Sequence, residues 1–266
     1  MGAMPGTLVS FHAHPDDEAI LTGGTIARAA DEGHRVVLVF ATRGELGEML
    51  DGVSRTTSGL GEHRSREAER AAAALGVARV AFLGFHDSGM ADDPANDADG
   101  AFWSADREEA AQRLAALLTE EHAEVLTTYD ERGGYEHPDH IKVHEVGLRA
   151  AELAGTPKVF LATISRDHLE AMSVKYLDAF EESDVSQDDD PAIGVDEGRI
   201  TTIVDVTSQL TRKRAAMAAH ASQIPDSSFF LSLPDDAFAE VFGTEWFIRV
   251  GRRPPTSAAD REDWIF

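Results

Sequence analysis

The sequence predicts an α/β protein whose mainly parallel β-sheet is covered by helices on both faces. Apolar runs rich in β-branched residues alternate with helix-like stretches through residues 1–165. Such an alternation favours parallel strands that are joined by helical crossovers. Gly33 and Gly76 stand where two of these helices are expected to end.

The expected elements follow one another without long gaps. Strands are expected over residues 7–13, 35–42, 79–85, 124–129 and 158–164. Helices are expected near residues 18–32, 62–75, 105–121 and 138–154. Farther along, the pattern predicts a strand over 199–206 and a helix over 207–221.

The chain is expected to form a single domain over residues 1–266. Its Rossmann-like core spans about residues 5–165, and a smaller C-terminal portion spans about residues 166–266. In such sheets, ligands bind outside the carboxyl ends of the strands. Stretches rich in Gly, Asp, Ser or Asn predict loops over residues 44–60, 86–104 and 181–198.

Composition excludes several classes of function. The chain has 24 Lys and Arg against 48 Asp and Glu, which gives a net charge of −24. Such a surface repels phosphate backbones and anionic lipids, so we expect neither nucleic acid nor a membrane as partner. No long apolar stretch and no secretory signal is evident, so we expect a cytoplasmic protein. Because cysteine is absent, a metal site must use His, Asp and Glu.

Two short segments gather histidines and carboxylates directly after expected strands. The first is FHAHPDDEAIL over residues 11–21, and the second is TYDERGGYEHPDH over residues 128–140. Crowded like charges are unfavourable in a packed core, whereas a bound cation stabilises them. Neighbouring parallel strands end at the same edge of a sheet, so the two segments are expected to meet there.

The residue types and their spacing in these segments predict a metal site. His14 and Asp17 are three residues apart, and so are His137 and His140. His14, Asp17 and one of the two later histidines can form a facial set of three ligands, which leaves a position for water, as in catalytic zinc sites. Asp16 can reach the same cavity without being a ligand. The alternative interpretation of this pattern is acidic helix caps and packed histidines.

Further motifs extend these two segments over most of the chain. They are AHPDDE (13–18), GG (23–24), TRGELGE (42–48), RSREAERAAAALGV (64–77), LGFHDSGM (83–90) and HPDH (137–140). In this combination the chain resembles the zinc-dependent de-N-acetylases of the PIG-L/LmbE family. TTYDERGGYEHPDH and DSGM are similar to the actinobacterial branch, whose members act on the mycothiol precursor and on mycothiol S-conjugates.

The resemblance implies a metal centre and a base. His14, Asp17 and His140 would bind one Zn²⁺, and Fe²⁺ can occupy the same ligands. Asp16 would be the general base that takes a proton from the attacking water.

Three residues of the second segment would complete the chemistry by the same resemblance. His137 would face the opposite side of the substrate, where it aids the oxyanion or protonates the leaving amine. Tyr135 would donate a hydrogen bond to the oxyanion. Asp139 would tune His137.

Substrate contacts are also implied. Arg64 and Asp87 match family positions that hold sugar hydroxyls, and Glu45 and Glu48 are further candidates. His220 recurs in relatives near the substrate cavity, with a helix-end cap as the alternative. For Arg64 the alternative is a surface salt bridge.

Other histidines have alternative or structural roles. His12 is an alternative ligand if it shares a strand face with His14, and His144 lies one helical turn beyond His140. Structural or exposed positions are expected for His63, His86, His122 and His168.

The expected function is metal-dependent removal of an N-acetyl group from an N-acetylglucosaminyl substrate. The alternative is an amidase that cleaves a larger glucosaminyl amide, such as a mycothiol S-conjugate or a natural-product glycoside. Dinucleotide binding is excluded, because the first turn lacks GxGxxG and its carboxylates repel a pyrophosphate. The expected partner is thus a small amino sugar, and the sequence leaves open whether the chain forms a homo-oligomer.

Overall fold

The computed structural model describes residues 5–48, 59–176 and 193–266. Its centre is a seven-stranded sheet with the order β3-β2-β1-β4-β5-β7-β6. The strands are β1 (Thr7–His12), β2 (Arg35–Phe40), β3 (Arg79–Phe82), β4 (Val125–Tyr129), β5 (Lys158–Thr163), β6 (Thr202–Asp205) and β7 (Thr244–Arg249). The first five strands are parallel, whereas β7 is antiparallel to both β5 and β6. The predicted α/β class with a mainly parallel sheet is confirmed.

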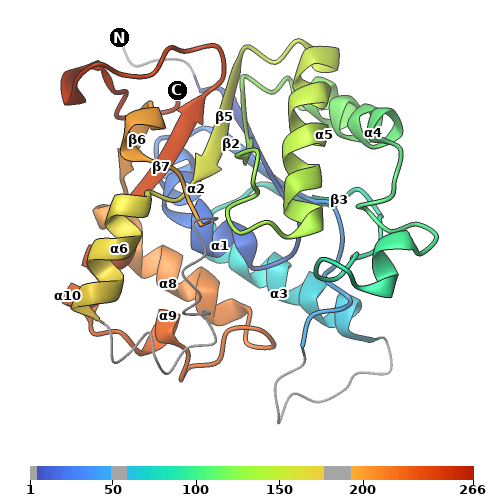
Figure 1. The fold of residues 1–266 in the computed structure, drawn as a ribbon, viewed down its shortest axis with the longest axis horizontal. Helices are drawn as coiled ribbons and strands as arrows, with labels where there is room; N and C mark the ends of the chain where they lie inside the picture. Colours follow the sequence, from blue (N-terminus) through green and yellow to red (C-terminus); the bar gives the residue numbers. More distant parts are fainter. Residues whose placement is uncertain (1–4, 49–58, 177–192) are drawn as a thin grey trace.

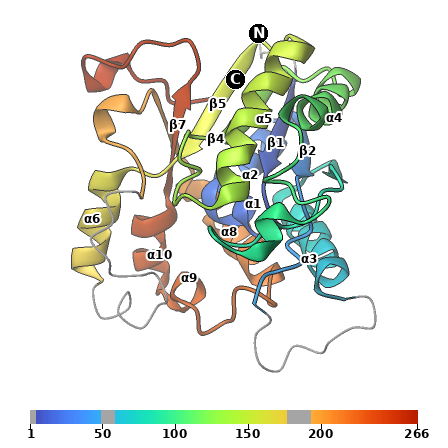
Figure 2. The same cartoon turned by 45° about the vertical axis from the view of Figure 1, so that its right-hand side comes forward.

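Helices cover both faces of this sheet (Figures 1 and 2). One layer contains α1 (Asp17–Leu21), α2 (Gly23–Asp31), α3 (Gly59–Leu75) and α8 (Leu210–Ala219), and the other contains α4 (Arg107–Glu120) and α5 (Pro138–Ala154). The remaining helices are α6 (Arg166–Lys175), α9 (Phe229–Ser232) and α10 (Asp235–Phe242). None of the helices in the described ranges is both long and apolar enough to cross a membrane.

The central strands are buried on both faces because apolar side chains occupy consecutive positions. In β2, Val36, Val37, Leu38, Val39 and Phe40 have no exposed surface. Continuous apolar runs of this kind are typical of parallel strands between two helical layers.

The strand order reverses between β1 and β4. From β1 the chain continues to β2 on one side, and from β4 it continues to β5 on the other. The parallel register pairs Leu8 with Val125 and Ser10 with Thr127. The segments that follow these two strands therefore begin side by side, at the place where ligands bind in sheets of this type.

The predicted helix over residues 18–32 is wrong in its continuity, because the chain breaks at Thr22 into α1 and α2. The Glu245 carboxylate accepts hydrogen bonds of 2.8 Å each from the backbone N–H groups of Gly24 and Thr25. A Cβ atom on Gly24 would lie 2.4 Å from Val206, so the start of α2 packs directly against the C-terminal portion. The local pattern predicts a single continuous helix here, but the distant residue Glu245 caps the start of a second one.

The C-terminal portion contains elements that the pattern did not reveal. The predicted strand over 199–206 is shorter in the structure, and β7 and α6 were not predicted. In β7, Glu245 and Phe247 occupy the buried positions, so the sequence lacks the apolar alternation that indicates a strand. Of the predicted loops, residues 49–58 and 181–192 lie outside the described ranges.

Candidate metal and active site

Three side chains from the two segments converge at the carboxyl ends of β1 and β4. His14 follows β1, Asp17 begins α1, and His140 lies in the first turn of α5. One ligand atom of each residue lies within 4.8 Å of the other two. The Asp17 Oδ2 atom is 3.7 Å from His14 Nδ1 and 3.4 Å from His140 Nε2. At most 9% of each residue is exposed, so the group is largely shielded from water.

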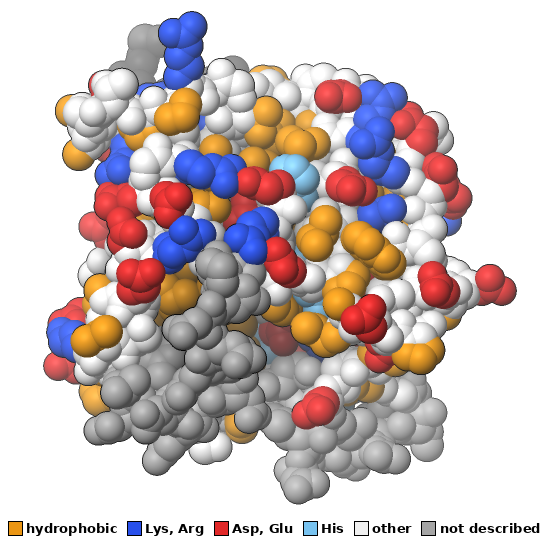
Figure 3. All heavy atoms as spheres, in the orientation of Figure 1, with side chains coloured by type: hydrophobic (Ala, Val, Ile, Leu, Met, Phe, Trp, Pro, Cys, Tyr) orange, Lys and Arg blue, Asp and Glu red, His pale blue; other side chains and the backbone are white. Residues whose placement is uncertain are grey.

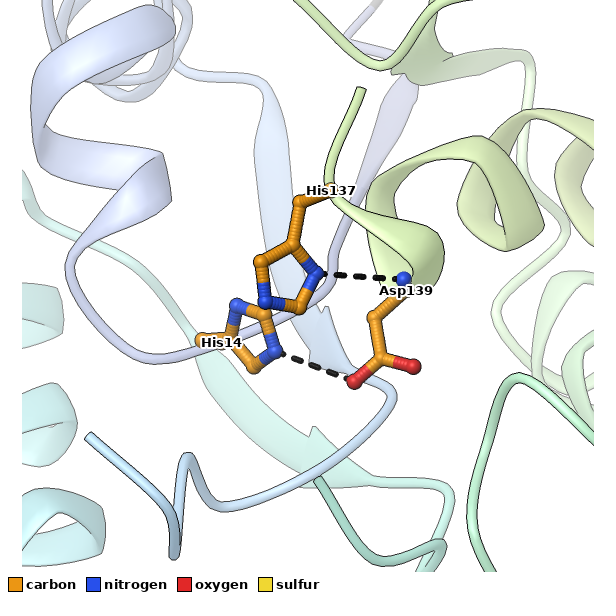
Figure 4. A group of neighbouring side chains, drawn as sticks. All are labelled: His14, His137 and Asp139. Carbon is orange, nitrogen blue, oxygen red and sulfur yellow. Dashed lines mark hydrogen bonds and ion pairs between the residues drawn. The ribbon is translucent and has the colours of Figure 1, made fainter. Parts of the chain in front are cut away.

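The second nitrogen of each imidazole ring is held by an oxygen atom. His14 Nε2 lies 3.1 Å from a carboxylate oxygen of Asp139 (Figure 4), and His140 Nδ1 lies 3.0 Å from the backbone oxygen of Gly133. Because these oxygens accept hydrogen bonds, the protons are assigned to His14 Nε2 and His140 Nδ1. In the neutral form of each ring, the lone pair then lies on the nitrogen that is nearer Asp17. This donor set, with acceptors behind it, fits a divalent metal ion.

A second group of three residues shares His14 with the first. His14, His137 and Asp139 also offer ligand atoms within 4.8 Å of one another (Figure 4). In this group, however, Asp139 Oδ2 already accepts hydrogen bonds from His14 and from the Ser88 N–H, at 3.1 and 3.0 Å. His137 Nδ1 accepts the backbone N–H of Asp139 at 3.2 Å. Asp139 therefore contacts His137 through its backbone N–H, whereas its carboxylate bonds His14.

The electrostatics of the group favour a bound cation. Burial disfavours the charged form of His14, but the hydrogen bond to Asp139 and the charges of Asp17 and Asp87 outweigh it and raise its pKa to about 9. Burial also opposes ionisation of Asp17, yet His140 and His14 lower its pKa to about 2. A metal ion must therefore compete with a proton for His14, which makes its affinity dependent on pH.

Asp16 lies beside this group with its backbone in an unusual conformation. Its φ angle is 115°, in the left-handed region that only glycine adopts readily; such a backbone costs about 1–3 kcal/mol, and it is frequent at functional sites. Its carboxylate lies 3.3 Å from the Arg64 guanidinium and is 18% exposed. Burial and the neighbouring charge of Asp17, against the opposing charge of Arg64, raise the pKa of Asp16 to about 6. A carboxylate of this kind is suited to proton transfer near neutral pH.

His137 and Tyr135 present donors to the same space. Burial and the nearby His14 lower the pKa of His137 to about 4, so the ring is neutral at pH 7. Since its Nδ1 atom accepts a hydrogen bond, its proton is assigned to Nε2. Tyr135 is 45% exposed, and its hydroxyl lies 3.5 Å from His140 Nε2. Desolvation on the side of the ring that faces the site, together with the charges of Asp17 and Asp16, raises the pKa of this phenol, which keeps it protonated.

Arg64 is buried, in contrast to the alternative of a surface salt bridge. It donates hydrogen bonds to the backbone oxygens of Gly44 and Pro15, at 2.9 and 2.6 Å, and only 4% of it is exposed. Its buried Nε atom has no hydrogen-bond partner within the described residues. Arg64 therefore joins the loop after β2 to the turn that carries Asp16.

Asp87 lies between the metal group and the loop after β2. Its carboxylate accepts the N–H groups of Leu46 and Gly89, at 3.2 and 2.9 Å, and one oxygen is 3.6 Å from His14 Nε2. Glu45 accepts the backbone N–H of Asp87 at 3.2 Å. Both carboxylates thus order the loops around the site.

Glu48 and His220 occupy different environments. Glu48 is exposed, and its backbone oxygen accepts a hydrogen bond of 3.0 Å from the Gln223 amide. His220 has no exposed surface, and its Nε2 atom lies 2.6 Å from a carboxylate oxygen of Glu18. Burial opposes protonation of His220, but Glu18 raises its pKa. Sequence reasoning missed Glu18, although it lies within the AHPDDE motif.

The alternative ligands do not join either metal group. Both ring nitrogens of His12 have other partners, Ser10 Oγ at 2.8 Å and the Tyr129 hydroxyl at 3.0 Å. His144 Nδ1 lies 2.9 Å from the backbone oxygen of Tyr129. Two of the histidines without an assigned function, His86 and His122, are exposed. Of the other two, His63 contacts Glu67 and His168 contacts Trp246.

Apolar side chains lie near the acidic and histidine-rich site. Figure 3 shows histidine and acidic side chains inside a hollow of the surface, with hydrophobic side chains around it. Four exposed hydrophobic residues belong to the loops that contribute to the site: Leu46, Met90, Trp103 and Tyr135.

Comparisons with known proteins identify similar chains over most of the sequence. The family model "PIG-L: GlcNAc-PI de-N-acetylase" matches residues 9–151. The chain is 40% identical over 285 residues to the 1D-myo-inositol 2-acetamido-2-deoxy-alpha-D-glucopyranoside deacetylase of Thermomonospora curvata, covering 97% of this chain and 95% of that protein.

Solved structures share the fold at lower sequence identity. The N,N'-diacetylchitobiose deacetylase of Pyrococcus horikoshii has a TM-score of 0.64 and 20% identity, and the match covers 96% of this chain and 89% of that chain. GalB, a 4-carboxy-2-hydroxymuconate hydratase, has a TM-score of 0.61 and 21% identity. The match covers 95% of this chain and 99% of that chain. Because a hydratase shares this fold, the reaction must be argued from the site.

Proposed function

Because the chain belongs to the PIG-L family of de-N-acetylases, we propose that it hydrolyses the acetamide of an N-acetylglucosaminyl-inositol to acetate and the free amine. The observation that carries this proposal is the convergence of His14, Asp17 and His140 next to Asp16. A relative that covers nearly the whole chain bears the name of this activity.

The proposed metal ligands are His14, Asp17 and His140, with one Zn²⁺ per chain. When bound, a zinc ion polarises the amide carbonyl and lowers the pKa of water toward ~7. Two imidazoles and one carboxylate also suit Fe²⁺, so the identity of the metal must be measured. Loss of a ligand removes one of the three donors that hold the ion.

Asp16 is proposed to move the protons, and His137 is proposed to stabilise the oxyanion. Asp16, with its carboxylate partly exposed and its pKa near 6, takes a proton from the attacking water. The same proton then passes from Asp16 to the leaving nitrogen, so that the amine leaves as a neutral molecule. His137 is neutral at pH 7, and its Nδ1 atom accepts the Asp139 N–H, so its Nε2–H group donates a hydrogen bond to the oxyanion.

Tyr135 is proposed to stabilise the developing oxyanion. Its hydroxyl is protonated and lies beside His140. A donor of this kind contributes about 2–4 kcal/mol to the transition state in other acyl-transfer enzymes.

Sugar recognition is proposed for Arg64, Asp87 and Glu48. The Arg64 guanidinium lies 3.3 Å from the Asp16 carboxylate, and an Asp87 oxygen lies 3.6 Å from His14 Nε2. Arg64 and Asp87 therefore bring a donor group and an acceptor group to the site, which sugar hydroxyls require. The exposed Glu48 offers a further acceptor.

A larger amide is the second candidate substrate. The exposed hydrophobic side chains on the loops around the site favour a substrate with an apolar group beyond the amino sugar. The same three metal ligands would serve the cleavage of either amide, so the comparison of substrates decides between the two activities.

The test combines metal analysis with an assay for the released amine. Metal content is measured by mass spectrometry on the purified chain, and turnover is measured on N-acetylglucosaminyl-inositol and on a glucosaminyl S-conjugate. We expect Asp16→Ala to retain metal and lose turnover, and His140→Ala to lose both. His144→Gln is the matched control one helical turn away, and it should keep the metal. Full activity of Asp16→Ala would show that another group is the base.

A further inference from the structure

The backbone of Asp16 is held by a side chain two residues farther along. Its N–H donates a hydrogen bond of 2.9 Å to Glu18 Oε2. This N–H belongs to a residue with a φ angle of 115°, which the local chain does not favour. The Glu18 carboxylate therefore stabilises an otherwise unfavourable turn at the base.

Glu18 is in turn held by the C-terminal portion. Its other carboxylate oxygen lies 2.6 Å from His220 Nε2, although 202 residues separate the two. Neither residue has any exposed surface. A carboxylate without access to water requires such partners, so the orientation of Glu18 depends on the imidazole ring.

Helix α3 anchors the same region from two points. Glu67 accepts hydrogen bonds from the backbone N–H and the hydroxyl of Ser222, two residues after His220. One turn before Glu67, Arg64 donates to the backbone oxygen of Pro15 at 2.6 Å. The turn that carries Asp16 is thus held from the α3 side by Arg64 and from the α8 side through His220.

We propose that Glu18 and His220 are a pair of positioning residues that fix the main chain of Asp16, so that its carboxylate faces the attacking water. The inference rests on the proposed function, because it requires Asp16 as the base. It assigns to His220 an indirect role, through Glu18, in place of the substrate contact that the sequence predicts. Neither residue touches the substrate.

The kinetic test uses Glu18→Ala, His220→Leu and the double variant. Each single variant should lower kcat by about 10²-fold with little change in KM and with metal content retained, because small displacements of a reacting group have effects of this size. If His220 acts through Glu18, the double variant should be no slower than Glu18→Ala. Glu18→Gln keeps an acceptor for the Asp16 N–H and should recover most of kcat.

A second readout does not depend on activity. Amide hydrogen exchange can be monitored by NMR. In both Glu18→Ala and His220→Leu, the Asp16 N–H should exchange faster with solvent than in the wild type. If Glu18→Ala does not fold, His220→Leu provides the same kinetic and exchange measurements. Lys213→Met is the matched control, because it breaks a different buried ion pair on α8; it should be less stable but keep kcat below its unfolding temperature.

The outcomes separate this proposal from the proposed function. A wild-type kcat in Glu18→Ala would overturn the positioning role, and so would a double variant in which the two single effects multiply. In either case an inactive Asp16→Ala would still support Asp16 as the general base. A fully active Asp16→Ala would overturn both. A loss of kcat that follows loss of metal would also contradict the positioning role.

Discussion

The Nε2 atom of His14 lies 3.1 Å from a carboxylate oxygen of Asp139, which follows it by 125 residues in the chain. Asp139 has no exposed surface, and its carboxylate is also held by the Ser88 N–H. The contact orients the His14 ring so that Nδ1 faces Asp17. One hydrogen bond thus sets both the direction and the tautomer of a metal ligand that comes from the other half of the site.

Asp139→Asn is therefore expected to weaken metal binding by about 10–100-fold, the usual effect of losing such a partner. The amide NH₂ can donate to His14 Nε2, which moves the ring proton to Nδ1 and blocks the lone pair that faces Asp17. Competition with a chelator at pH 7 measures the metal Kd. An unchanged Kd would show that the ring is oriented by other contacts.

Gly133→Ala is expected to displace His140. A Cβ atom at this position, where φ is +61°, would lie 2.3 Å from His140 Cβ and 2.6 Å from its backbone carbon. Metal content should fall well below that of the wild type. Gly134→Ala is the control, since that residue also has a positive φ but no atom within 4 Å of its Cβ position. Equal metal loss in both variants would indicate backbone strain alone.

Glu121 is expected to contribute stability that depends on pH. It bonds Arg35 and Arg79, each at 2.6 Å, and the hydrogen bond from Arg35 is the main reason that its pKa is lowered. Its contribution is complete above the unfolded-state pKa of about 4.3 and is lost as the pH falls through the lower folded-state value. Glu121→Gln should cost roughly 0.5–1.5 kcal/mol at pH 7.

Urea unfolding at several pH values measures this contribution. The difference between wild type and Glu121→Gln should shrink below about pH 4. Glu120→Gln is the control. Within the described residues, the exposed Glu120 is hydrogen-bonded to Arg79 alone, so this substitution should change the free energy of unfolding little. A difference that is constant with pH would contradict the assigned cause.

Lys213→Met is expected to destabilise the fold by about 3–5 kcal/mol, because it leaves a buried carboxylate without its cation. The Lys213 ammonium lies 2.7 Å from Glu245 Oε1, and both side chains are at most 2% exposed. Adding Glu245→Gln should recover part of the loss, since the charge is then removed as well. Thermal unfolding measures both, and an unaffected Tm in Lys213→Met would contradict the prediction.

Most strands and helices before residue 165 could be predicted because their signals are local. Five apolar runs, such as the one that becomes β2, leave few alternatives to buried parallel strands. The break between α1 and α2 could not be predicted in this way, because it depends on Glu245, which follows Gly24 by 221 residues. β7 enters the sheet antiparallel between β5 and β6, a position that its own residues do not specify.

For the site, the sequence by itself determined the inventory of groups: imidazoles and carboxylates at the ends of two strands, with no thiols. The tertiary structure decided which of these groups act on one another. It placed His14 against Asp139 and His220 against Glu18, and it occupied both nitrogens of His12 with other partners. The reason is physical, because residue types set the available chemistry, whereas hydrogen bonds between distant segments set the direction and protonation of each group.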